Sequence, residues 1–518
     1  MVMMVTEVPL PDNHSSPRSP YEALLNQACV HAQEYLASMR DRHVGVTKHA
    51  RDGMLALGGA MPTVGEPADV VLRSLHEAGS PATTATMGGR FYGGVIGGAL
   101  PVTVAAHWLA DAWDQNACLY EISPLSAYLE ELVLAWLLDL FNLPGSAGSC
   151  LVTGTQMADV TALAAARTSL LKDVGWDVEQ DGLFGAPPIS VVVGDEVHAT
   201  MFKALALLGF GRERVIRIPV DSQGRMLASR IPELRGPAII CAQLGNVNSG
   251  ACDPIDDICE IAQRSGAWVH VDGAFGLWAA TAPARRHLVA GFTAADSWAT
   301  DGHKWLNIPH DCGIAIVRDR EALRRSMAIS ASYYGPLSQR EPMQWCPESS
   351  RRARAVELWA ALRFLGKEGV AELVERTCQH ASRFAKNLSN AGFEVLNEVE
   401  LNQVLLTFGT DEQTERVIQA VQEEGTCWCG GTIWKGRRAM RISVSSWATS
   451  SEDVDRSSHA IRRMAEQVLA GTEAEDGTTF CDGETCGEEV KLEKSFWHWK
   501  STRPRGIQPT RCFTTSRQ

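Results

Sequence analysis

The chain has 518 residues, of which 45% are hydrophobic and 21% charged, a composition typical of globular proteins with more than one core. Its 48 basic and 61 acidic side chains give a net charge of −13, which argues against a nucleic-acid-binding body. The longest strongly apolar run, residues 132–138, is far too short to cross a bilayer, and the fourteen cysteines form no disulfide framework. We therefore expect a cytoplasmic protein that binds neither membranes nor nucleic acids.

The N-terminal segment, residues 1–85, is predicted to be disordered at first and then helical. Four prolines fall within the first twenty residues, a pattern unlike a signal peptide. Residues 21–39 have a helical pattern and lead into a polar connector. Residues 86–101 follow with six glycines, a composition suited to close packing against a neighbouring segment. A tight turn over the core explains that composition as well as a functional loop does.

Residues 150–167 are predicted to form a short strand that ends at Gly154 and an alanine-rich helix that begins near Thr155. The first turn of a helix presents unpaired N–H groups and a partial positive charge, so it can hold a phosphate. The side chains of Thr155 and Gln156 add hydrogen-bond donors at this end. Many α/β proteins use the same strand–glycine–helix arrangement for chain geometry alone, so both interpretations stay open.

Strand-like and helix-like stretches alternate from there to residue 317. His198, Asn246 and Asp272 each follow a buried strand pattern, at residues 189–193, 238–242 and 268–272 respectively. This alternation predicts an α/β fold with a mostly parallel sheet and helices on both faces. Residues just past the carboxyl ends of such strands lie where these folds bind ligands. His198 could instead be a helix-capping histidine.

Lys304 lies in a loop before the strand-like run 313–317, next to Trp305 and Ile308. A lone lysine among apolar residues is usually a surface residue whose stem covers its neighbours. Asp272 changes this interpretation, because a carboxylate at the end of a buried strand can pair with the protonated ring nitrogen of pyridoxal 5′-phosphate (PLP). A lysine amine can form a Schiff base with the aldehyde of the same cofactor. Together the two residues predict a PLP site.

Two motifs, one with Ser297, His303 and Lys304 and the other with His270, Asp272 and Ala274, resemble the group II PLP-dependent decarboxylases. The resemblance covers roughly residues 80–465. It implies the PLP-dependent transferase fold type I, with a large PLP-binding domain at 86–335 and a smaller C-terminal α+β domain at 345–465. Residues 470–518 lie outside the resemblance, and their composition predicts a flexible tail.

The resemblance also implies roles for the candidate residues. Thr155, Gln156, Ser297 and His303 are expected to hold the phosphate, and His198 to stack on the PLP ring. The full set expected to bind the cofactor is Lys304, Thr155, Gln156, His198, Asn246, Asp272, Ala274, Ser297 and His303.

The catalytic residues implied by the resemblance are Lys304, Asp272, His198 and Tyr333. Tyr333, or Tyr334 beside it, is expected to donate a proton after carbon dioxide leaves, in the site of a neighbouring subunit. No metal is expected.

Two segments at the edge of the predicted site follow from the same resemblance. The segment with Arg90, Phe91 and Tyr92 is expected at the substrate entrance. Arg441 matches a family arginine, although a charge at the edge of a strand explains it equally well.

The expected reaction is decarboxylation of an L-amino acid to the amine and carbon dioxide by a homodimer. Thr155, Asp159, Gly273 and His310 depart from the family pattern. One alternative is an aminotransferase or a decarboxylating aldehyde synthase of the same fold; Tyr333 favours plain decarboxylation, because aldehyde-forming members lack that tyrosine. Another alternative is a non-catalytic binding protein, which the intact Lys304, Asp272 and His198 argue against. Which amino acid is the substrate stays open.

Overall fold

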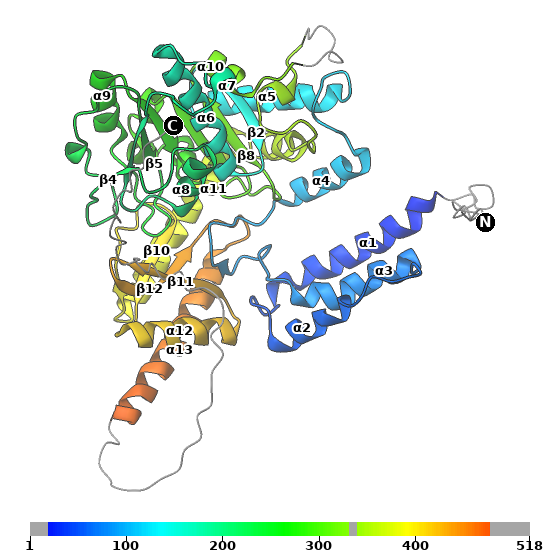
Figure 1. The fold of residues 1–518 in the computed structure, drawn as a ribbon. Coiled ribbons are helices and arrows are strands. Elements are labelled where there is room, and N and C mark those ends of the chain that lie inside the picture. Colours follow the sequence, from blue (N-terminus) through cyan, green and yellow to red (C-terminus); the bar gives the residue numbers. More distant parts are fainter. Residues whose placement is uncertain (1–18, 331–338, 477–518) are drawn as a thin grey trace, which may run out of the picture. The chain divides into compact units, whose positions relative to one another are not determined.

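The computed structural model describes residues 19–330 and 339–476 (Figure 1). Its α-helices are α1 (Pro20–Ala37), α2 (Lys48–Gly53), α3 (Ala68–Ser74), α4 (Pro101–Trp113), α5 (Pro124–Leu140), α6 (Thr155–Asp173), α7 (Val178–Asp181), α8 (Ala199–Leu207), α9 (Ile255–Ser265), α10 (Arg320–Met327), α11 (Ala355–Asn390), α12 (Asp411–Glu424) and α13 (Ser451–Asp476). Its strands are β1 (Phe91–Tyr92), β2 (Gly148–Val152), β3 (Ser190–Gly194), β4 (Ile216–Ile218), β5 (Ala238–Gln243), β6 (Trp268–Asp272), β7 (Ser297–Asp301), β8 (Gly313–Val317), β9 (Glu394–Val395), β10 (Gln403–Thr407), β11 (Trp428–Trp434) and β12 (Arg437–Ser443).

Seven strands form the larger sheet, in the order β2-β8-β7-β6-β5-β3-β4. The neighbours from β7 to β4 pair in parallel, and β8 runs antiparallel to both β7 and β2. The five residues of β6 and of β7 are all buried, as expected for strands covered on both faces. The predicted α/β class with a mostly parallel sheet is confirmed, with β8 as the antiparallel exception.

Helices cover both faces of this sheet, because successive residues of each strand point to opposite sides. Cys150 and Val152 of β2 pack with α6, α8 and α10, whereas Leu151 packs with α5 and α9 on the other face. The two apolar cores hold the strands in place and leave their carboxyl ends open for polar residues.

A second sheet, ordered β1-β11-β12-β10-β9, packs with α12, α13 and the last part of α11. Figure 1 shows β10, β11 and β12 in yellow and orange beside α12 and α13. Gly366 interrupts α11 with a φ of 61°, so one helix ends there and a second one follows. Strand β1 comes from the glycine-rich segment and pairs in parallel with β11.

The N-terminal helices α1 and α3 pack against each other, as Figure 1 shows in blue. The expected polar connector after residue 39 in fact contains α2, and α3 follows it later in the N-terminal segment. No helix within residues 19–330 and 339–476 has the length and apolar character needed to span a bilayer.

Candidate active site

A cavity of about 580 Å³ lies at the carboxyl ends of the parallel strands. Gln243, Asp272 and Asp301, the last residues of β5, β6 and β7, all line it. The cavity brings together most of the predicted site residues, namely Thr155, Gln156, His198, Asp272, Ala274, His303 and Lys304. Parallel strands end at a common edge, so residues far apart in the sequence meet there.

Lys304 follows β7, and its Nζ lies 3.0 Å from Oδ2 of Asp301. The lysine side chain is 26% exposed, whereas Asp301 is 2% exposed. The amine is therefore reachable from the cavity while its counterion is buried. Our sequence analysis missed Asp301, although its place at the end of a buried strand is the same signal that identified Asp272.

Asp272 is held at the end of β6 by the N–H of Ala274, which donates to Oδ1 over 3.1 Å. Burial raises the pKa of this carboxyl group, and the electrostatic effects of nearby His198 and Lys304 partly oppose that rise. A protonated pyridine nitrogen would supply the buried carboxylate with a directly bonded cation. The position of Asp272 thus fits its predicted role.

His198 precedes α8, and its Nδ1 lies 2.7 Å from the hydroxyl group of Thr200. Burial lowers the pKa of the imidazole, against the opposing effect of Asp272. The backbone N–H of Thr200 also points at Nδ1, so this nitrogen accepts and the neutral ring carries its proton on Nε2. An uncharged ring with one N–H donor suits both stacking and hydrogen bonding to a carboxylate.

The first turn of α6 forms another wall of the cavity. Thr155 Oγ1 is buried without a hydrogen-bond partner in the described structure, and the Thr155 N–H donates to Asp301 Oδ1 over 2.7 Å. A Cβ added to Gly313 would lie 2.4 Å from the carbonyl carbon of Gly154, so glycine at 313 lets the two segments meet. A helix N-terminus with an unpartnered hydroxyl group fits a phosphate.

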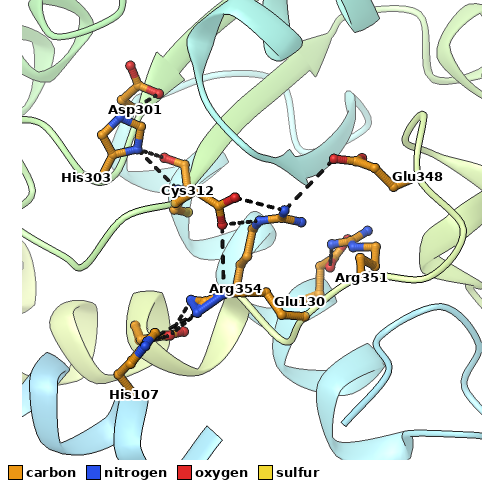
Figure 2. A network of polar contacts seen from close by, with 11 residues as sticks. His107, Glu130, Asp301, His303, Cys312, Glu348, Arg351 and Arg354 are labelled. Carbon is orange, nitrogen blue, oxygen red and sulfur yellow. Dashed lines mark hydrogen bonds and ion pairs between the residues drawn. The ribbon is translucent and has the colours of Figure 1, made fainter. Parts of the chain in front are cut away.

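His303 lies beside this turn, and Figure 2 shows its ring between Asp301 and Cys312. Its Nδ1 lies 3.0 Å from the carbonyl oxygen and 3.2 Å from the backbone nitrogen of Cys312, and its Nε2 lies 3.7 Å from Asp301 Oδ1. The ring of His310 packs against that of His303, with centroids 4.3 Å apart. The amine, the buried carboxylate and the helix N-terminus therefore fit PLP, and the other candidates in the cavity surround them.

Residues 60–408 match the family described as pyridoxal-dependent decarboxylase conserved domain. The chain belongs to this family. It is 26% identical over 451 residues to tryptophan decarboxylase 1 of Oryza sativa subsp. japonica, covering 79% of this chain and 86% of the relative. It is 28% identical over 326 residues to the acidic amino acid decarboxylase GADL1 of Bos taurus, covering 60% and 62%.

Solved structures agree on the fold. The Oryza sativa TDC structure with PLP and tryptamine matches with a TM-score of 0.80 at 24% identity, over 88% of this chain and 99% of the other. The mouse CSAD structure matches with a TM-score of 0.78 at 22% identity, over 86% and 98%. The predictions of a PLP cofactor, the type I fold and an amino acid carboxy-lyase are confirmed, and the matches do not favour the alternatives.

One predicted phosphate ligand of this decarboxylase lies elsewhere. Ser297 is the first residue of β7, so it lies at the opposite end of the strand from Asp301 and does not line the cavity. The Ser297 hydroxyl group accepts from Trp268 Nε1 over 2.8 Å and lies 2.9 Å from Nδ1 of His270. The prediction that Ser297 holds the phosphate is therefore corrected: its hydroxyl group is fully buried in a structural network.

The same network leads to Asp159 in the first turns of α6. The Ser297 hydroxyl group, which accepts from Trp268, lies 2.9 Å from Nδ1 of His270, and Nε2 of the same ring lies 3.1 Å from Asp159 Oδ1. Burial lowers the pKa of His270 to about 3 and raises that of Asp159 well above its ordinary value. Oδ2 of Asp159 is buried without a partner in the described structure. Asp159 is thus a buried acid close to Asp272. The negative charge of Asp272 also raises the pKa of Asp159.

Asn246 also lies outside the cavity lining, and its side chain shapes the loop after β5. Its Oδ1 accepts from the N–H groups of Asn248 and Ser249, and its Nδ2 donates to the Glu196 carbonyl oxygen. Gln243, at the end of β5, lines the cavity in its place. A polar loop after a strand did not reveal which of its residues faces the ligand.

The expected entrance residues are corrected as well. Tyr92 is fully buried in the core of the second sheet, and Phe91 is 8% exposed, because β1 pairs with β11. Val95 and Ile96, a few residues later, line the cavity instead.

Arg441 does not line the cavity, and one of its guanidinium nitrogens donates to the carbonyl oxygen of Val247 over 3.4 Å. Tyr333 and Tyr334 lie outside the described residues.

Proposed function

We propose that this decarboxylase removes carbon dioxide from an L-amino acid with an apolar or aromatic side chain, using Lys304 to hold PLP and Asp272 to hold the ring nitrogen. The observation that supports this assignment is that Lys304, Asp272 and the first turn of α6 line a single cavity. When bound, PLP accepts the electron pair released as the bond to the carboxylate breaks.

The residues of the chain prepare that step. Asp272 keeps the proton on the ring nitrogen, because a buried carboxylate is most stable beside a positive charge. The Nε2–H of His198 can donate to the substrate carboxylate, and its neutral ring adds no cation that would favour retention of that carboxylate. Transfer of the substrate carboxylate from water into the cavity would favour loss of the neutral carbon dioxide.

The cavity walls support the substrate class. Val95, Ile96 and Phe275 give it an apolar side, and Lys304 is the one lysine or arginine among the described residues that line it. An acidic substrate side chain would find no free cation there, because Lys304 is committed to the cofactor. An apolar or aromatic side chain would instead bury its surface against these walls.

We further propose that the working unit is a homodimer in the cytoplasm. The N-terminal segment exposes large apolar side chains, including Leu25 on α1, Leu55 after α2 and Val71 on α3, at 56%, 70% and 50%. Exposed apolar side chains grouped on one segment often mark an interface. The cysteines in the described part of the chain are all unpaired, which supports a reducing compartment.

A screen of carbon dioxide release tests the function. The PLP-loaded protein is incubated with each common L-amino acid, and Lys304→Ala serves as the inactive control. We expect release from aromatic or large aliphatic amino acids. Preference for glutamate or aspartate would contradict the substrate class, and no release from any amino acid would contradict the activity. Light scattering of the same sample tests the dimer, and a fully active monomer would contradict it.

A further inference from the structure

Three metal-ligating side chains meet between the N-terminal helices, away from the active-site cavity. His31 and Glu34 lie one turn apart on α1, and His76 lies in the π-helical turn that follows α3. Glu34 Oε2 lies 3.7 Å from His31 Nδ1 and 3.4 Å from His76 Nε2. A ligand atom from each of the three residues lies within 4.8 Å of the other two.

Each imidazole has a nitrogen available to a metal ion. Both ring nitrogens of His31 are buried and have no hydrogen-bond partner in the described structure, an arrangement that costs free energy unless a ligand is bound. Nδ1 of His76 lies 3.1 Å from the Ser80 hydroxyl group, which leaves Nε2 directed at Glu34. Metal-binding histidines commonly use their second nitrogen in this way, because the outer hydrogen bond fixes the ring.

We propose that His31, Glu34 and His76 form a binding site for a divalent transition metal ion, with Zn²⁺ the best match to two imidazoles and one carboxylate. Bonds of about 2.0–2.1 Å in a tetrahedral site place ligand atoms roughly 3.3 Å apart, close to the separations of Glu34 from both histidines. The two rings stack with centroids 4.0 Å apart, so the His31 ring must rotate for both lone pairs to converge. That rotation breaks no hydrogen bond of the ring in the described structure.

The site has a consequence for the N-terminal segment. Its three ligands come from α1 and from the turn after α3, so one ion would link these two helices. The histidines also line a cavity of about 610 Å³, which leaves room for a water molecule as the fourth ligand. None of the three residues lines the active-site cavity, although Ile96 and His310 line both that cavity and the one beside the histidines.

Calorimetric titration with Zn²⁺ tests the site on the full, tag-free and PLP-loaded chain after removal of bound metals with a chelator. We expect one high-affinity equivalent per chain. His31→Ala and His76→Ala should each lower the affinity by at least about 100-fold, and Ser80→Ala, which removes only the outer hydrogen bond, by about 10-fold. The matched control is His49→Ala, because His49 is an exposed histidine on α2.

Far-UV circular dichroism checks that each variant keeps its helices, and His31→Gln and His76→Gln replace any alanine variant that does not. Co²⁺ gives a second measurement, because a tetrahedral site produces strong visible bands that both histidine variants should lose. The proposal is overturned if the parent chain binds no Zn²⁺ or if folded variants of His31 and His76 bind it as tightly as the His49 control.

Discussion

Lys304 Nζ lies 3.0 Å from Asp301 Oδ2, while Oδ1 of the same carboxylate accepts the N–H of Thr155. One buried carboxylate therefore connects the cofactor-binding amine to the helix N-terminus that is proposed to hold the phosphate. The geometry of Asp301 fixes the distance between the two ends of the PLP site. It also keeps the lysine near the cavity floor when no aldehyde is bound.

We predict that Lys304→Ala lowers turnover by at least about 10³-fold while the protein stays folded, because no other amine lines the described cavity. Borohydride reduction should fix PLP to the parent protein and not to the variant, as mass spectrometry would detect. Lys203→Ala is the matched control, since Lys203 is an exposed lysine on α8. A near-normal rate in Lys304→Ala would show that another amine carries the cofactor.

Asp272→Asn should bind PLP and lose activity by about 10²–10⁴-fold, the range typical for loss of a proton-holding group. The amide oxygen can still accept from the Ala274 N–H, but it carries no charge to stabilise the protonated ring nitrogen. Rates at saturating substrate measure the effect, and Asp257→Asn on the surface of α9 is the control. Equal rates in both variants would rule out the assigned role of Asp272.

Asp159→Asn is expected to stabilise the protein at pH 7. Burial raises the pKa of Asp159 in the folded state, so this state binds more protons than the unfolded chain above pH 3.8 and stability falls as pH rises. Asparagine keeps a hydrogen-bonding side chain beside His270 Nε2 and removes the titration. The gain should be at least about 1 kcal/mol at pH 7 and should vanish near pH 4, as urea unfolding would measure. A gain that did not depend on pH would contradict this explanation.

The burial of His270 should make the protein less stable as pH falls, which is the opposite of the effect of Asp159. The pKa of His270 falls from 6.5 to about 3 on folding, so its stabilising effect is present above pH 6.5 and is lost as pH falls toward 3. Between pH 7 and pH 5 this loss amounts to about 2 kcal/mol. Between pH 7 and pH 5 the His270→Gln variant should therefore lose about 2 kcal/mol less stability than the parent protein, whatever its stability at pH 7. His459→Gln, at an exposed site, should behave like the parent protein.

Tyr333 remains a prediction of the sequence resemblance. Tyr333→Phe should bind PLP normally, form less amine and form more aldehyde in air, because an intermediate without its proton donor lives longer. The loss of a general acid is typically worth about 10²–10⁴-fold in rate. Chromatography of the products decides the outcome, and Tyr334→Phe is the matched control. Amine formation at the parental rate in Tyr333→Phe would shift the assignment to Tyr334 or His198.

The sequence predicts the large sheet well because its signals are local. The apolar run of β6 and the glycine before α6 mark a strand and a helix start without reference to the rest of the chain. Asp272 could be recognised because it ends a buried strand, and Lys304 because its amine and that carboxylate suit the same cofactor. Ser297 could not be placed, because its motif does not show which end of a strand it occupies.

Other features depend on contacts between distant segments. Tyr92 was predicted to lie at the substrate entrance. Its strand instead pairs with β11, more than 300 residues later in the chain. Asp159 appeared only as a departure from a family pattern. Its buried bond to His270 depends on how α6 packs on β6, which spacing alone does not give.

Strand β1 has a practical consequence for anyone who recombines this enzyme with its relatives. Its two residues belong to the second sheet, yet the chain then continues through Val95 and Ile96 in the active-site wall to Gly97, where an added Cβ would lie 2.2 Å from the Lys304 carbonyl oxygen. A chimera that exchanges only residues 345–465 would set a foreign β11 against the parental β1. The exchanged unit should therefore include residues 86–101, so that the edge strand and its partner come from the same parent.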